Sequence, residues 1–300
     1  DAYLKLKLEA DGKIHISFSE FSLYSQCGHK HLLVKYLKLV TEPPSIHLYF
    51  GNAIHAAIEH SIKDGIGAEK RVAFFRENFT KEMTNNMKSD PSFSELGHFL
   101  EQGENILRIL NVEKIFEKYK IVAVEEPLYE NLFGKYFFKG FIDLIVQDRV
   151  TGEYVIIDWK TSGEEWDVPK KKKDEIFMCQ MRFYKYFYAR KHNIPLDQIQ
   201  CRYVVLNRLK SKKNPKGGFG SLQRVDIDST EDEMKFSLIK LATAVKNIHI
   251  LKEFKKSKYE VDSNGKSKEK DCFFCQFKNN VHPMCNRDDE QYVGLLEEHK

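Results

Sequence analysis

The sequence predicts a mixed α/β fold in which helices flank a mixed β-sheet. Three observations lead to this prediction. Residues 17–119 carry apolar side chains at helical spacing, residues 120–162 change to β-rich runs, and residues 175–254 alternate between helical and strand-like patterns. The hydrophobic content of 42% and the charged content of 31% are those of an ordinary globular protein, so the fold is expected to have a buried core.

Helices are expected before the β-rich region. Ser17 suits the N-cap of a first helix, with Ser19 as a competing cap, and Gly28 would end this helix. A second helix is predicted to begin near Asn52 and to end at Gly65. Residues 68–119 keep helical spacing with few breakers, and they predict two or three further helices.

Strands dominate the middle of the chain, and helices return after it. The run VTGE supplies a turn between two strands, which predicts a hairpin. The predicted elements are strands at 120–130, 136–148 and 153–162, a helix at 175–191, strands at 199–209 and 222–228, and a helix at about 231–254.

Two acids stand among apolar residues in the predicted hairpin, Asp143 in GFIDLI and Asp158 in YVIID. Opposed residues of an antiparallel hairpin have a constant index sum. A turn centred at Val150 and Thr151 sets this sum near 301, and 143 plus 158 is 301. The two side chains would then be cross-strand neighbours, with Cβ atoms about 5 Å apart. Lys160 shares a face with Asp158, because side chains alternate along a strand.

Two opposed carboxylates repel one another and are costly in apolar surroundings unless a cation lies between them. Mg²⁺ or Mn²⁺ takes such oxygen ligands, and a nearby ammonium can orient a water or neutralise charge on a phosphate. The alternative is that the three side chains form only an ion pair at the strand ends. Runs of lysine also occur at 169–175, 208–218 and 252–258. They are interpreted either as solvated loops or as a rim that binds phosphates.

Five motifs, in order along the chain, resemble those of the PD-(D/E)XK nucleases. The resemblance is to the RecB-like and AddB-like branch with a C-terminal cysteine cluster, which includes the CRISPR adaptation nucleases. The runs GFIDLI and YVIIDWKTS resemble its G-x-x-D and D-x-K-T strands. The other matching runs are SFSEFSLYSQC, FGNAIHAAIEH, QMRFYKYFY and CFFCQFK with its later cysteine. The resemblance covers about residues 16–286.

This resemblance implies a restriction-endonuclease-like fold, in which a mixed central β-sheet is flanked by helices and the cysteine cluster joins the two ends of the chain. It also implies one RecB-like nuclease domain over residues 1–300. The expected parts are a mainly helical part at 16–119 with Cys27 and His55, a catalytic core at 120–210, and a linker with the cysteine cluster at 255–290.

The resemblance further implies the site residues of a Mg²⁺- or Mn²⁺-dependent deoxyribonuclease. The implied metal ligands are Asp143, Asp158, the carbonyl of Trp159 and His55. The Trp159 side chain is expected in the core, and Lys160 would align the attacking water.

Residues beyond the hairpin complete the expected site. Gln180 and Tyr184 lie four apart on one helical face and would position the DNA backbone or the lysine. Further candidates are Thr161, for a phosphate contact, and one of two adjacent acids on the preceding strand. Because neighbouring strand residues face opposite ways, only one of these acids can point inward. The family pattern of an acid before proline favours Glu126 over Glu125.

Three of the six cysteines lie close together near the C-terminus: Cys272, Cys275 and Cys285. This spacing predicts a metal or cluster motif in a reducing compartment. The resemblance implies a structural [4Fe–4S] cluster completed by Cys27, which would tie the two ends of the chain together. The nine-residue gap before the last cysteine departs from the family and contains His282, so Zn²⁺ remains an alternative. Cys179 and Cys201 are expected to be small buried residues.

The implied partner is DNA, either single-stranded or at duplex ends, in recombination, repair or replication. No G-x-x-x-x-G-K-[ST] run occurs, so we expect a helicase or a single-strand-binding protein to be a separate chain. No apolar run reaches the roughly 20 residues of a membrane span, and a cytoplasmic location in a bacterium or a viral host is expected, with an organelle or the nucleus left open. The alternative function is a non-catalytic nucleic-acid-binding or cluster-bearing interaction module on a nuclease scaffold.

Overall fold

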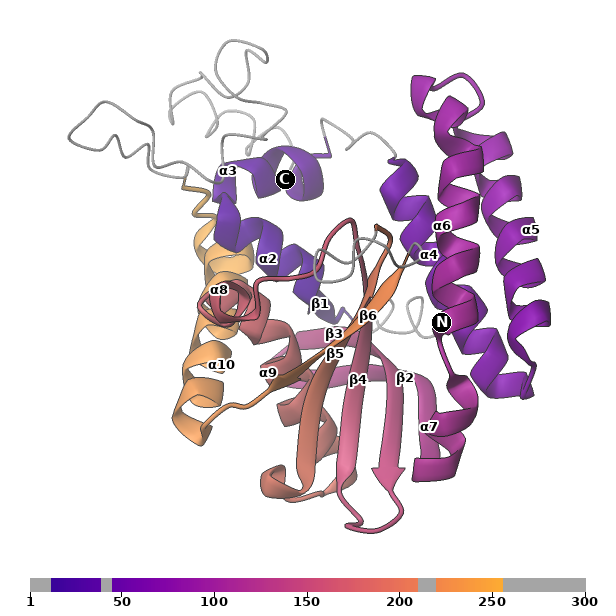
Figure 1. The fold of residues 1–300 in the computed structure, drawn as a ribbon. Coiled ribbons are helices and arrows are strands. Elements are labelled where there is room, and N and C mark those ends of the chain that lie inside the picture. The colour runs from indigo at the N-terminus through magenta and orange to yellow at the C-terminus, as the bar shows by residue number, and fades with distance from the viewer. Residues whose placement is uncertain (1–11, 39–44, 210–219, 256–300) are drawn as a thin grey trace, which may run out of the picture. The chain divides into compact units, whose positions relative to one another are not determined.

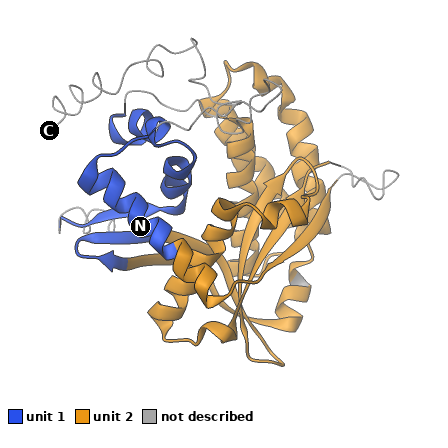
Figure 2. Cartoon of the chain, turned by 90° about the vertical axis from the view of Figure 1, so that its left-hand side faces the viewer, with its two compact units in different colours: residues 1–43, 131–139, 238–300 blue, residues 44–130, 140–237 orange. Residues whose placement is uncertain are grey.

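The computed structural model describes residues 12–38, 45–209 and 220–255. The chain divides into two compact units, which Figure 2 colours separately. One unit comprises residues 1–43, 131–139 and 238–300, and the other comprises residues 44–130 and 140–237. The smaller unit therefore combines both ends of the chain.

The smaller unit contains short elements from the start and the end of the described chain. Strand β1 (Ile14–Ser17) pairs in parallel with the first residues of β3 (Tyr136–Asp148), from Ile14 opposite Tyr136 to Ser17 opposite Lys139. The other described elements that fall in this unit are α2 (Phe18–Gln26), α3 (Gly28–His31), the π-helical turn η1 (Leu32–Tyr36), the end of α10 (Glu231–Lys246) and the π-helical turn η4 (Asn247–Leu251).

Ser17 is the N-cap of α2, as predicted, and its side chain accepts a hydrogen bond from the backbone N–H of Glu20 at 3.2 Å. Gly28 does not end this helix. Cys27 is the C-cap of α2 and also the N-cap of α3, which begins at Gly28. Gly28 instead allows a close approach, because a Cβ there would lie 2.9 Å from the backbone nitrogen of Lys255.

The larger unit contains helices on either side of a mixed sheet, which confirms the predicted fold class (Figure 1). Its helical part comprises α4 (Ile46–Asp64), α5 (Ala68–Asn86), the 3₁₀ turn η2 (Pro91–Glu95), α6 (Leu96–Ile109), α7 (Val112–Lys118), α8 (Val168–Lys172), α9 (Glu175–His192), the 3₁₀ turn η3 (Leu196–Gln198) and the start of α10 (Glu231–Lys246). The strands are β2 (Tyr119–Phe133), β3 (Tyr136–Asp148), β4 (Tyr154–Ser162), β5 (Ile199–Asn207) and β6 (Ser221–Ile227).

The sheet of the larger unit runs in the order β3-β4-β5-β6, and β2 also pairs with β3. The pairs β3–β4 and β5–β6 are antiparallel, whereas β4 and β5 are parallel. Val155, Ile157 and Trp159 of β4 belong to the core formed with α4, α5 and α6, which confirms the buried Trp159. Because side chains alternate along a strand, Asp158 and Lys160 point to the other face of the sheet.

Arg71 connects the three helices that support this core. Its guanidinium is fully buried, donates to Ser61 Oγ of α4 at 2.9 Å, and donates to the carbonyls of Leu107 and Leu110 at the end of α6. The terminal carbonyls of a helix have no partners within the helix, so this arginine satisfies them. The contact fixes α4, the helix that carries His55.

Replacing Gly103 by alanine should destabilise the protein by about 1–3 kcal/mol, because the new Cβ would lie 2.2 Å from the buried ring of Phe75. Gly97 is the control in the same helix, since a Cβ there meets no atom within 4 Å. Gly97→Ala should stabilise the helix by up to about 1 kcal/mol. Chemical denaturation measures both changes, and two substitutions of the same sign would contradict this packing.

Candidate active site

The β3–β4 hairpin has the register that the sequence predicts. Its recorded pairs run from Gln147 opposite Tyr154 to Leu144 opposite Ile157, and each pair sums to 301. The next position along the same register places Asp143 opposite Asp158. The two carboxylates are therefore brought to one end of the hairpin, as expected.

Asp143 is held by groups from a second strand and a helix. Its Oδ2 accepts the backbone N–H of Trp159 at 2.8 Å, and His55 Nδ1 lies 3.5 Å from the same oxygen. His55 comes from α4 and lies beside Asp143, another residue of the predicted ligand set. One oxygen of Asp143 is thus fixed in place.

Asp158 has two side-chain partners, Lys160 and Gln180. Lys160 Nζ lies 2.7 Å from its Oδ2, and Gln180 of α9 donates to its Oδ1 at 3.0 Å. Lys160 is the ionic partner of Oδ2, and this buried oxygen has no further hydrogen-bond partner among the described residues. This oxygen therefore keeps the capacity to bind a cation.

Gln180 and Tyr184 share one face of α9, as predicted from their spacing. Gln180 Nε2 lies 3.2 Å from the Tyr184 hydroxyl, which accepts from it. Sequence reasoning missed Tyr203 of β5, whose hydroxyl donates to Gln180 Oε1 at 3.4 Å and whose ring lies 5.6 Å from Lys160 Nζ. Strand alternation on β5 was the available signal, but nothing in the sequence indicates which face meets α9.

The two adjacent acids of β2, Glu125 and Glu126, have the reverse of the predicted orientations. Glu126 forms ion pairs with Lys191 at 2.7 Å and His192 at 3.1 Å, away from the hairpin acids. Glu125 instead lines a pocket together with His55. Its φ of 56° lies in the left-handed region, which is strained for a residue other than glycine. The prediction of Glu126 is corrected to Glu125.

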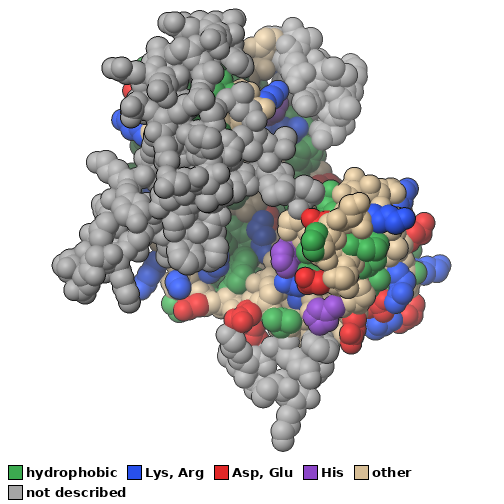
Figure 3. Space-filling model, turned by 90° about the horizontal axis from the view of Figure 1, so that it is seen from above, with side chains coloured by type: hydrophobic (Ala, Val, Ile, Leu, Met, Phe, Trp, Pro, Cys, Tyr) green, Lys and Arg blue, Asp and Glu red, His purple; other side chains and the backbone are tan. Residues whose placement is uncertain are grey.

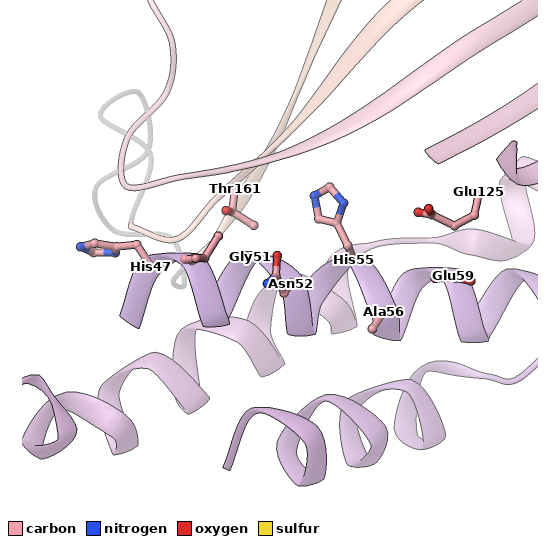
Figure 4. A pocket seen from close by; sticks show the side chains of 9 residues that line it. His47, Gly51, Asn52, His55, Ala56, Glu59, Glu125 and Thr161 are labelled. Atoms are coloured by element: carbon pink, nitrogen blue, oxygen red, sulfur yellow. The ribbon is translucent and has the colours of Figure 1, made fainter. Parts of the chain in front are cut away.

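The pocket that Glu125 and His55 line lies beside α4 and has a volume of about 450 Å³. Figure 4 shows His55 and Glu125 turned toward the same space, with Thr161 above the helix. The residues that line it are His47, Leu48, Gly51, Asn52, His55, Ala56, Glu59, Glu125 and Thr161. Figure 3 shows histidine, acidic and basic side chains next to one another on one face of the described chain. Thr161 lines this pocket, and its contact with a phosphate stays a prediction.

Two carboxylic acids of the site, Asp158 and Glu125, have raised pKa values. Burial, followed by repulsion from Asp143, raises the pKa of Asp158 to about 6, although Lys160 opposes this shift. Burial raises the pKa of Glu125 to about 7, with further contributions from Asp143 and Glu59. A divalent cation would relieve both effects, since a nearby positive charge favours the ionised carboxylates.

His55 responds to the same charges. Burial by itself lowers the pKa of His55, but the hydrogen bond to Asp143 and the negative charges of Asp143 and Asp158 outweigh burial and raise it. Burial also raises the pKa of the Tyr184 phenol, so that this group stays protonated and able to donate.

The donor set fits a hard divalent cation, because carboxylate oxygens converge with one imidazole beside them. The described residues do not contain three or more His, Cys, Asp or Glu side chains already arranged around one metal position. The best match to a metal ligand is Asp158 Oδ2, a buried oxygen whose partner among the described residues is Lys160. Metal binding by the carbonyl of Trp159 stays a prediction.

Most of the predicted cysteine cluster lies outside the described residues. This holds for Cys272, Cys275, Cys285 and His282. Cys27 is described, and its Sγ accepts the backbone N–H of Lys30 at 3.4 Å. Cys179 and Cys201 are buried, as predicted, and burial raises the pKa of Cys201 to about 12.

The chain next to Cys27 does contact the segment that precedes the cysteines. The backbone N–H of His29 donates to the carbonyl of Lys255 at 3.2 Å, and the Tyr24 hydroxyl donates to the carbonyl of Glu253 at 2.8 Å. Both contacts lie within the smaller unit.

Comparison with known proteins places this site in a nuclease family. The model of the PD-(D/E)XK nuclease superfamily matches residues 15–280. The chain belongs to this superfamily, and Asp158-Trp159-Lys160 matches the (D/E)XK pattern of its name. Superfamily members generally use divalent metal ions such as Mg²⁺, so membership supports a hydrolytic nuclease activity.

A solved structure that resembles this chain is described as a "Putative exonuclease" from Eubacterium rectale. It has a TM-score of 0.48 and 11% sequence identity, over 80% of this chain and 82% of that chain. No curated protein sequence matches this chain. Within the described ranges, no helix has both the length and the apolar content that a bilayer crossing requires.

Proposed function

We propose that this protein is a Mg²⁺- or Mn²⁺-dependent deoxyribonuclease that hydrolyses phosphodiester bonds. The substrate class that we propose is single-stranded DNA or DNA ends, cleaved as an exonuclease in recombination, repair or replication. The supporting observation is the convergence of Asp143, Asp158 and Lys160 at one end of the β3–β4 hairpin, with His55 beside them.

Asp143 and Asp158 would hold the metal ion, together with the Trp159 carbonyl. His55 and Glu125 would lie at its edge, because both face the same pocket. When bound, the ion would act as a Lewis acid that stabilises negative charge on the phosphate and lowers the pKa of an attacking water.

The remaining residues would act on the water and on the phosphate. The Lys160 ammonium lies 2.7 Å from Asp158 and would orient the water or neutralise charge on the phosphate oxygens. Gln180 fixes Asp158 through a 3.0 Å hydrogen bond, and Tyr184 and Tyr203 fix Gln180 in turn. Gln180 and Tyr184 would thereby position Asp158 in addition to the DNA backbone.

We further propose that Cys27 joins Cys272, Cys275 and Cys285 in a structural [4Fe–4S] cluster, as in the AddB-like branch. The contacts of residues 253–255 with the chain around Cys27 support this, because they bring the start of the cysteine-bearing segment close to α3. Zn²⁺ with His282 is the competing occupant. A visible absorption band near about 400 nm in the anaerobically purified protein distinguishes iron from zinc.

The function is tested with end-labelled single-stranded and duplex DNA, with 5′- or 3′-blocked ends, in Mn²⁺ and in EDTA. The proposal predicts metal-dependent release of short products and protection by a block on one end. Binding without cleavage would identify the non-catalytic module instead. Cleavage of RNA but not of DNA would contradict the proposed substrate.

Metal binding should strengthen as the pH rises. Asp158 and Glu125, with pKa values of about 6 and about 7, are mostly protonated at pH 5.5 and ionised at pH 8. Protons therefore compete with the cation at low pH, and affinity should rise at least about tenfold over this range. Mn²⁺ titration followed by electron paramagnetic resonance measures the Mn²⁺ affinity at each pH. Glu125→Gln should move the midpoint to lower pH, and an unchanged affinity across the range would contradict the assignment.

A further inference from the structure

The pocket continues from the proposed catalytic residues along one side of α4. His47, Gly51 and His55 are spaced four residues apart, so they lie on one face of the helix, and all three line the pocket. His47 and His55 are separated by about 12 Å along the helix axis. This distance is longer than one phosphate group, so the pocket has room for more of the strand than the scissile phosphate.

The end of β4 forms the other wall. A Cβ on Gly51 would lie 3.3 Å from Thr161 Oγ1, so the helix and the strand meet there. Arg208 follows β5, and its backbone N–H donates to the carbonyl of Ser162 at 2.8 Å. Arg208 does not itself line the pocket, but its backbone is thereby fixed one residue beyond Thr161 and its side chain lies near His47, and both of these residues line it.

The Arg208 side chain is oriented and only partly solvated. Its Cζ lies 4.6 Å from the ring centre of Phe99 and 5.7 Å from that of Phe50, and its Nη1 donates to Gln102 Oε1 at 3.0 Å. Among the described residues, no carboxylate lies within ion-pair distance of it. Burial lowers the pKa of Arg208, and the more distant Glu95 only partly opposes this. A fixed guanidinium without a carboxylate partner is suited to binding an anion.

His47 lies close to Arg208. Its ring centre lies 5.3 Å from that of Phe99, the ring on which Arg208 also stacks. Burial and the charge of Arg208 lower the pKa of His47. A phosphate bound beside them would raise the pKa of His47 and favour its charged form, so that both side chains could contact the same anion.

We propose that Arg208 and His47 bind a second, non-scissile phosphate of the same DNA strand, one or two nucleotides from the phosphate that is cleaved. The strand would lie along α4 over Gly51, with the exposed Leu48 beside a sugar or base. Arg208 is then a substrate-positioning residue. This inference rests on the proposed nuclease function and adds to it a requirement for at least two adjacent linkages.

The first test compares Arg208→Gln with Arg190→Gln. Arg190 is a matched control, since it also stacks on two rings, those of Tyr186 and Phe187, but pairs with Glu130. Arg208→Gln should raise KM for a single-stranded oligonucleotide about 10- to 100-fold with kcat within about twofold. The slope of log affinity against log salt should fall by about 0.7, the loss of one phosphate contact. Arg190→Gln should change neither quantity.

The second test uses the unmodified protein, so it does not depend on the folding of a variant. Oligonucleotides with a neutral methylphosphonate at one linkage at a time are cleaved in Mn²⁺. We expect one position, one or two linkages from the cleaved bond, to raise KM by the same factor as Arg208→Gln, and to add nothing in that variant. Equal cleavage at every such position, or additive effects, would overturn the inference. A protein that cleaves no oligonucleotide would overturn the proposed function instead.

Discussion

Asp158→Asn is expected to lower kcat for DNA cleavage at least about 1,000-fold and to weaken Mn²⁺ binding at least about 100-fold. The substitution keeps the shape of the side chain and its hydrogen bond with Gln180, but removes the charge from the oxygen that faces Lys160. That oxygen is buried and has Lys160 as its ionic partner, with no further hydrogen bond among the described residues, so a lone pair stays available to a cation. Loss of a charged metal ligand removes both affinity and electrostatic stabilisation of the transition state.

The control for this substitution is Asp228→Asn. Asp228 also pairs with a lysine, Lys172 at 3.9 Å, but its side chain is 95% exposed and lies apart from the pocket. Its replacement should leave cleavage and Mn²⁺ affinity within about twofold of the unchanged protein. The assignment fails if Asp158→Asn keeps more than a tenth of the activity, or if the control loses as much.

Lys160→Met is expected to lower kcat about 100- to 10,000-fold while Mn²⁺ affinity stays within about tenfold. The side chain is not a metal ligand, so its loss should act on the chemical step and not on ion binding. Methionine keeps a long apolar stem that can still lie near Tyr203, where the ammonium now sits 5.6 Å from the ring centre. Single-turnover cleavage and Mn²⁺ titration separate the two effects.

Lys172→Met serves as the control, because it removes the lysine of the exposed Asp228 pair. It should leave kcat unchanged. An Lys160→Met variant with normal kcat would show that this ammonium only neutralises Asp158. A variant that loses Mn²⁺ binding in parallel with activity would show that the lysine maintains the site and takes no part in the reaction.

The hairpin and the α9 pair were predictable because they depend on local rules. A turn of known position and the alternation of a strand fix the register, which places Asp143 opposite Asp158. The helical repeat likewise places Gln180 and Tyr184 on one face. In both cases, the position of one residue determines that of the other over a short stretch of chain.

Glu125 could not be predicted from the same rules. Regular alternation lets only one of the two acids face inward, and the proline after Glu126 favours that residue. Alternation is equally compatible with Glu125 facing inward, so it does not choose between the two acids. The left-handed backbone at Glu125 is not predictable either, because glutamate has no propensity for this conformation, which costs about 1–3 kcal/mol.

The start of α4 and the position of Arg208 also depend on tertiary contacts. The helix begins at Ile46 after the Ser45 cap, earlier than Asn52, although its first turns contain aromatic residues and Gly51. Burial of Phe50 against Phe75, Phe79 and Phe99 outweighs this weak propensity. The contacts of Arg208 with Phe99 and Gln102 join residues about a hundred positions apart, and local patterns carry no signal for such contacts.

The most direct test is a crystal structure of the protein grown with MnCl₂, with anomalous diffraction used to locate manganese. The carboxylate arrangement predicts a manganese peak within about 2.0–2.6 Å of one oxygen from each of Asp143 and Asp158, with His55 and Glu125 beside it. A structure in which those two side chains bind no manganese, obtained from protein that still cleaves DNA, would contradict the assignment of the active site.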